Sequence, residues 1–201
     1  MKTTAMTLMI LQIGALAYGR SEPSATGHTV TVCMAPGAIS GLTIQRAKML
    51  ASKMFGEIDV VIDWQQSSRS CPAEAILVSL SAVTPTALKP GALAYALPFE
   101  GRHIQVFYDR IESVCRGPMM EIVLAHVLVH EITHILEGVD RHSDQGVMKA
   151  KWDRTDFYHM KQSLLGFAPE DVRLIHLGLA ERRKLGLLAM NTDQSSAATL
   201  R

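Results

Sequence analysis

The stretch HEITHILEGVDRHSDQGVM, residues 130–148, decides how the rest of this sequence is interpreted. It holds three histidines, and Glu131 directly follows the first of them. His130 and His134 are four residues apart, so on a helix they lie one turn apart on one face and can bind a single ion. Histidines in a buried core or on a solvent face are the alternatives, but neither explains the adjacent glutamate. We therefore predict that His130 and His134 bind one catalytic Zn²⁺ and that Glu131 is the general base.

The two histidines fall in a long segment that is typical of a buried helix. Pro118 occupies a favourable first helical position, and no breaker follows until Gly138. Apolar residues lie on most sides of this segment, which indicates deep burial. His126 is one turn before His130 on the same face. It either supports the metal site or is a hydrogen-bonded core residue, and we favour the core.

A third metal ligand is predicted from the end of this helix. If the helix continued to His142, that residue would lie about 12 Å along the axis from His134 and could not reach the same ion. Gly138 tolerates the left-handed conformation that ends helices, so the chain can turn back and bring His142 to the metal. Met148 follows in SDQGVM, and we expect a tight turn that places it beneath the histidines as structural support.

Composition and charge limit the class of protein. Apolar residues make up 48% and charged residues 19% of 201 residues, which indicates a single globular domain, here predicted over 28–190. Basic and acidic residues number 20 and 19, without a long run of one sign. We therefore expect no nucleic-acid partner.

The N-terminus has the pattern of an export signal. Lys2 precedes an apolar run too short for a comfortable membrane span, and Ala15-Leu16-Ala17 fits a signal peptidase site. We predict a signal peptide at 1–19, a linker at 20–27 and a flexible tail at 191–201. The protein would be secreted or periplasmic, with no stable membrane span after cleavage. An uncleaved anchor or a buried N-terminal helix is the alternative.

Hydrophobic periodicity gives the order of elements. Strands are predicted at 28–36, 58–65 and 73–81, a hairpin at 92–99 and 103–111, and helices at 40–58, 118–138 and 167–187. This order predicts an α+β fold: a mixed twisted sheet of about five strands backed by helices, with a long active-site helix, a methionine turn and a C-terminal helix.

Three cysteines follow the predicted cleavage site: Cys33, Cys71 and Cys115. An odd number leaves at least one unpaired. We expect Cys71 and Cys115 to pair, since one lies in a loop and the other just before the histidine-bearing helix.

The motif resembles that of metzincin-type zinc metalloproteases, particularly small matrixin-like ones. The resemblance rests on His130-Glu131-x-x-His134, Gly138, His142-Ser143 and Gly146-Val147-Met148. The sequence is also similar to secreted bacterial proteins with an HExxHxxxGxxxHS…GxM pattern. Metzincins usually place the glycine three and the third histidine six residues after the second histidine, whereas here the spacings are four and eight. The resemblance also implies a substrate-facing edge strand at Leu93, Ala94, Tyr95 and Ala96.

These parts predict a secreted zinc endopeptidase that acts on peptides or proteins. Zinc lowers the pKa of a water molecule, and Glu131 accepts its proton and passes it to the leaving amine. Tyr95 or Tyr158 could contact the substrate, although packing roles are favoured for both. One alternative is a gluzincin-like peptidase whose third ligand is Glu170 or Glu181. The other is an exported zinc protein without catalysis.

Overall fold

The computed structural model describes residues 28–35, 39–67, 71–88 and 90–199, with side chains described as far as residue 186. The predicted signal peptide and linker lie outside these residues. Five strands form one sheet, in the order β2-β1-β3-β5-β4. The strands are β1 (His28–Met34), β2 (Val60–Gln66), β3 (Ile76–Ser81), β4 (Ala94–Ala96) and β5 (His103–Phe107).

All neighbouring strands pair in parallel except β4, which runs antiparallel to β5 at one edge. The sheet is therefore mixed, and the predicted hairpin supplies its antiparallel edge. The helices are α1 (Gly41–Gly56), α2 (Tyr108–Val114), α3 (Pro118–Glu137), α4 (Arg154–Gln162) and α5 (Pro169–Thr199). The predicted α+β fold is confirmed.

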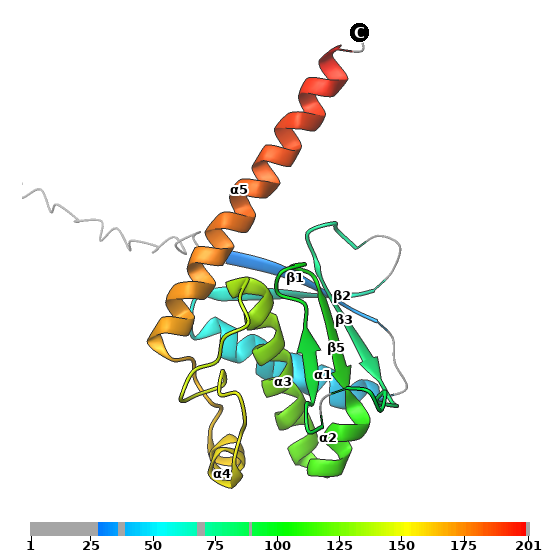
Figure 1. Cartoon of the computed structure of the whole chain (residues 1–201), viewed down its shortest axis with the longest axis vertical. Coiled ribbons are helices and arrows are strands. Elements are labelled where there is room, and N and C mark those ends of the chain that lie inside the picture. Colours follow the sequence, from blue (N-terminus) through cyan, green and yellow to red (C-terminus); the bar gives the residue numbers. More distant parts are fainter. Residues whose placement is uncertain (1–27, 36–38, 68–70, 89, 200–201) are drawn as a thin grey trace, which may run out of the picture.

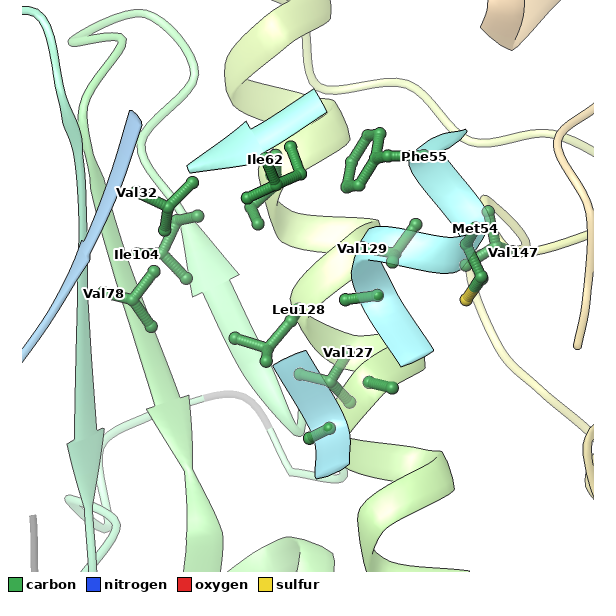
Figure 2. Close-up of a cluster of buried hydrophobic side chains, with 14 of the residues drawn as sticks. Val32, Met54, Phe55, Ile62, Val78, Ile104, Val127, Leu128, Val129 and Val147 are labelled. Atoms are coloured by element: carbon green, nitrogen blue, oxygen red, sulfur yellow. The ribbon is translucent and has the colours of Figure 1, made fainter. Parts of the chain in front are cut away.

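The core lies between the sheet and helices α1 and α3 (Figure 1). Val32, Val78 and Ile104 project from the sheet towards Leu128 of α3 (Figure 2). Helix α3 is buried over most of its length, as its apolar sequence predicts. Among the described residues, α3 is the one helix that is long and apolar enough to cross a membrane. However, 78% of its most apolar 18-residue segment is buried inside the fold, which is typical of a core helix.

The largest differences from the predicted boundaries are at the ends of β5 and α5. The second hairpin strand was expected to reach residue 111, but β5 ends at Phe107 and α2 begins at Tyr108. Phe107 and Ile111 are both buried and lie four residues apart, which is the spacing of one helical turn. Over so few residues, the same positions also fit the alternation of a strand. Helix α5 runs to Thr199 and extends beyond the rest of the fold, so it includes most of the segment 191–201 (Figure 1).

Helix α4 was not predicted, although its start carries a capping signal. Asp153 accepts hydrogen bonds from the backbone of Thr155 and Asp156, and the Asp156 side chain accepts one from the backbone of Asp153. This reciprocal pattern satisfies backbone donors that a helix start leaves free. The acidic pair was therefore the available signal for this helix.

The predicted disulfide between Cys71 and Cys115 is wrong, because Cys33 pairs with Cys71. Cys33 is fully buried on β1, and β3 pairs beside it through Leu77. The loop that contains Cys71 leads into β3 and so passes next to Cys33. Cys115 remains a free thiol that hydrogen-bonds the carbonyl of Ile111. The pairing depends on strand order, which the spacing of cysteines does not reveal.

Candidate metal centre

Helix α3 presents His130 and His134 on one face, one turn apart. His130 Nδ1 lies 2.9 Å from the carbonyl oxygen of Val147, and His134 Nδ1 lies 3.3 Å from that of Val139. A carbonyl oxygen only accepts, so in each of these bonds Nδ1 carries the proton. Each Nε2 then has a free lone pair.

The two lone pairs face each other. The Nε2 atoms of His130 and His134 are 3.1 Å apart, with no proton available between them in these tautomers. This arrangement is repulsive unless a cation lies beside both atoms. Two nitrogens bound to a tetrahedral zinc ion at 2.0–2.1 Å are roughly 3.4 Å apart, close to the observed spacing.

Burial keeps these imidazoles uncharged. Burial is the main cause that lowers the pKa of His130 to about 4, and it also lowers the pKa of His134. Neutral imidazole is the form that binds a metal ion. At neutral pH both side chains are therefore ready to act as ligands without first losing a proton.

His142 reaches the same point from the loop that follows α3. Gly138 ends the helix in the left-handed conformation, with φ 68°, and its N–H donates to the carbonyl of His134 at 3.0 Å. The chain then turns back, and the His142 ring lies 5.3 Å from that of His130 and 5.0 Å from that of His134, between centroids. One ligand atom from each of the three histidines lies within 4.8 Å of the others.

The turn around Met148 closes below this loop. Ser143 donates its N–H to the carbonyl of Met148, and Gly146 adopts a positive φ of 75°. A Cβ at Gly146 would lie 2.4 Å from the carbonyl oxygen of Gly166, so glycine is required there by space as well as by conformation. Met148 is fully buried in the core.

The contact that orients His130 comes from the backbone of this turn. It is the carbonyl of Val147, the residue before Met148, that accepts the Nδ1 proton. Such an outer hydrogen bond fixes the tautomer and the orientation of a metal-binding imidazole. The sequence predicted that the Met148 side chain supports the histidines, whereas in the structure the backbone carbonyl of Val147 makes the contact with His130.

Glu131 is buried next to the histidines. Burial is the main cause that raises its pKa to about 8, and the negative charge of Asp140 acts in the same direction. A hydrogen bond from the backbone of Ala96 opposes the shift. A carboxyl group with a pKa near neutrality is suited to accept a proton and to release it again.

The bond to Ala96 places Glu131 at the free edge of the sheet. The carbonyl of Leu93 accepts from Phe107, and the N–H of Leu97 donates to His103, so these residues face β5. Backbone groups alternate between the two sides of a strand. Those of Ala94 and Ala96 therefore point away from β5, towards the open edge beside Glu131.

A pocket of about 340 Å³ opens between β4 and α3. Its walls are mostly apolar and include Leu93 and Ala94 of the predicted substrate strand. His130 and Glu131 lie at one side of it. The other residues that line it include Val114, Val127, Trp152 and Phe157.

Trp152 was missed by the sequence analysis. Its indole lies edge-on to the rings of both His126 and His130, at centroid distances of 6.1 Å and 5.8 Å. His126 is buried and bonded at both nitrogens, to the carbonyl of Ile122 and to the N–H of Leu165. It is therefore a core residue, as favoured, and not a ligand.

The other residues considered as ligands or substrate contacts lie elsewhere. Glu170 pairs with Arg173 and Glu181 with Lys184, all exposed. Within the described residues, neither glutamate belongs to the histidine group. Tyr95 packs near Phe107, and Tyr158 is exposed beside His159.

The donor set fits zinc. Three neutral nitrogen ligands around one point leave one tetrahedral position for water or substrate, which is the arrangement of catalytic zinc sites. Calcium and magnesium favour oxygen ligands, and no carboxylate joins the group among the described side chains.

Among the comparisons with known proteins, the one with solved structures finds a similar fold. No protein-family model matches the sequence, and no curated protein matches it either. The structure is similar to that of archaemetzincin from Methanopyrus kandleri, with a TM-score of 0.54 and 16% identity over 79% of this chain and 99% of that chain. This likeness shows a fold similar to that of archaemetzincin, and it does not single out the matrixins.

Proposed function

We propose that this protein is a zinc-dependent endopeptidase of the metzincin type. The observation that carries the proposal is the cluster of His130, His134 and His142 next to the buried carboxyl group of Glu131. The archaemetzincin-like fold supports it, and two of the three histidines lie in the C-terminal half of the long buried helix α3. A purely structural metal site has no need for an adjacent base.

Each residue of the site has its own role in the proposed reaction. The three imidazoles would hold Zn²⁺, which supplies a Lewis acid that polarises water and the scissile carbonyl. Glu131 accepts the proton of the attacking water and then donates it to the leaving amine. Its raised pKa in the metal-free protein makes it a strong base for a carboxylate. The hydrogen bond from Ala96 holds the carboxyl group in place.

The substrate would be an extended peptide. The outward N–H and C=O groups of Ala94 and the outward C=O group of Ala96 can pair with a peptide backbone, which would add a strand to the sheet. The pocket beside His130 is largely apolar, so a large apolar side chain of the substrate would fill it better than a charged one. We therefore expect cleavage next to apolar residues.

We also propose that the protein is exported. Disulfides persist in oxidising compartments, and the Cys33–Cys71 bond is consistent with such a compartment. The N-terminal sequence supports the same proposal. Mass spectrometry of protein from the culture medium or periplasm should show a chain that lacks residues 1–19, and full-length chain in the cytoplasm would contradict it.

The peptidase proposal is tested with a quenched-fluorescence peptide library. Zinc-loaded protein should cleave peptides, chelator should stop cleavage, and added zinc should restore it. Glu131→Gln should keep zinc but lose activity by about a thousandfold, since general-base catalysis contributes roughly 10²–10⁴-fold. Glu170→Gln is a matched control at an exposed glutamate and should remain active.

Failure has two distinct forms. If the protein binds zinc and cleaves no peptide in the library, the alternative of a non-catalytic zinc-binding protein is favoured. If Glu131→Gln cleaves as fast as wild type, zinc peptidase activity stands but Glu131 is not its base.

A further inference from the structure

The loop that carries His142 has little regular structure of its own. His142 is exposed, whereas His130 and His134 are buried on a helix. A ligand on such a loop needs fixed neighbours, because a freely moving imidazole must lose conformational entropy when it binds a metal. Both neighbours of His142 in sequence make side-chain contacts that supply this restraint.

These contacts converge on one buried carboxylate. Asp171, in the first turn of α5, is fully buried. Its Oδ1 accepts hydrogen bonds from Arg141 Nη1, at 2.8 Å, and from the hydroxyl of Ser143. Arg141 Nη2 also donates to the Ser143 hydroxyl at 2.9 Å. Arg141, Ser143 and Asp171 therefore form one closed cluster around the position of His142.

The cluster is anchored to the two helices on either side. Arg141 Nη1 is 3.2 Å from the carboxylate of Glu137, the last residue of α3. Asp171 Oδ2 accepts the N–H of Ala168, just before α5 begins. Helices α3 and α5 approach closely, since a Cβ at Gly178 would lie 1.7 Å from the carbonyl oxygen of Leu136. The loop is therefore fixed against a rigid pair of helices.

We propose that Asp171 is a positioning residue for the third metal ligand. Through Arg141 and Ser143 it holds the backbone on both sides of His142, so that the imidazole is placed for the metal before the metal binds. This inference rests on the proposed function, because it assumes that the three histidines hold zinc. Asp171 itself does not belong to the histidine group.

A double-mutant cycle on zinc affinity tests the proposal. Asp171→Asn keeps the shape of the side chain and removes its charge. In the wild-type background it should weaken zinc binding about tenfold, the low end of the roughly 10–100-fold cost of losing a direct outer partner of a metal ligand, because Asp171 acts on His142 through Arg141 and Ser143. In a His142→Ala background the same change should alter zinc affinity by less than about twofold, because the ligand it positions is absent.

Two further variants separate positioning from folding. Ser143→Ala removes one arm of the cluster without a buried charge change and should weaken zinc binding about threefold, again only when His142 is present. Glu170→Ala, at the exposed neighbour of Asp171, should leave affinity unchanged. Affinity is measured by competition with a chromogenic chelator at one pH, and circular dichroism verifies that each variant is folded.

The outcomes distinguish failure of the positioning role from failure of the proposed function. An equal loss for Asp171→Asn in both backgrounds, or no loss in the wild-type background, would overturn the positioning role while zinc binding and the proposed function stand. If Asp171→Asn does not fold, the Ser143→Ala pair decides by the same criterion. Absence of zinc binding by the wild type contradicts the proposed function and this inference together.

Discussion

The three histidines of the site come from two contrasting regions. His130 and His134 lie on α3, where backbone hydrogen bonds and burial fix them: their exposed fractions are 9% and 6%. His142 lies on an exposed loop and depends on Gly138, on the turn at Gly146 and on the cluster around Asp171. Helix α3 is held by its own regular backbone hydrogen bonds, whereas the His142 loop is held by contacts with residues distant in sequence.

This difference has a physical consequence. The helix pair is preformed in any state that contains α3, because a helix fixes the spacing of residues four apart. The loop ligand is preformed only when α5 and the Gly166 segment have docked. We therefore expect the two regions to respond differently to substitution.

The largest effect should follow removal of a ligand from either region. His134→Ala and His142→Ala should each weaken zinc binding by at least about 1000-fold, more than the 10–100-fold cost of losing an outer partner. Only His134→Ala should also destabilise the metal-free fold, because His134 is buried and hydrogen-bonded to Val139. Chelator competition and thermal unfolding measure the two effects, and unchanged zinc affinity in His142→Ala would remove the loop from the site.

The next effect concerns the helix region and depends on pH. Burial holds the pKa of Glu131 at about 8 in the folded, metal-free protein, against 4.5 for an unperturbed glutamate. Between these values the folded state holds a proton that the unfolded chain has lost, so wild-type stability falls as pH rises. Because Gln does not titrate, metal-free Glu131→Gln should be as stable as wild type below pH 4.5 and about 4 kcal/mol more stable at pH 8, since one unit of pKa difference corresponds to about 1.4 kcal/mol.

Denaturant titrations in the presence of chelator measure that difference. Glu170→Gln is the control of opposite sign, because the bond to Arg173 lowers the pKa of Glu170. Its stabilising contribution is present above the unfolded pKa, so this variant should be slightly less stable than wild type at pH 8 and equal to it in acid. A pH-independent difference for Glu131→Gln would show that burial does not control its ionisation.

A smaller effect sharpens the account of the loop. Gly146 and Gly138 both have positive φ, but a Cβ collides with backbone only at Gly146. Gly138→Ala should cost about 1 kcal/mol from conformation alone, whereas Gly146→Ala should cost about 2–3 kcal/mol. Gly146→Ala should also weaken zinc binding more than Gly138→Ala does, since Val147 follows Gly146 and orients His130. Equal costs in thermal unfolding would show that the Gly166 contact is not needed.

The same contrast explains what the sequence could predict. Pro118, Gly138 and the spacing of the histidines are local signals, and the start and end of α3 follow from them. Helix α2 was not predicted, and its first residues were assigned to β5, because alternation and helical spacing coincide over a few residues. The local signal for that helix was too short to be decisive.

Partners distant in sequence were not predictable from one chain. The disulfide between Cys33 and Cys71 depends on β3 lying beside β1, which spacing does not reveal. Trp152 and Asp171 contact the site from segments that carry no metal-binding motif. Their contributions arise from packing, which only the folded arrangement of helices and strands defines.

The central claim is that three histidines and no other side chain hold one zinc ion. X-ray absorption at the zinc edge of protein purified without chelator tests it most directly. We predict about one zinc per chain, bound by three imidazole nitrogens at about 2.0–2.1 Å and one further oxygen or nitrogen atom. A protein without zinc, or a zinc ion with a sulfur ligand, would contradict the account. So would a spectrum with only two imidazoles that changes when Glu170 or Glu181 is replaced by alanine.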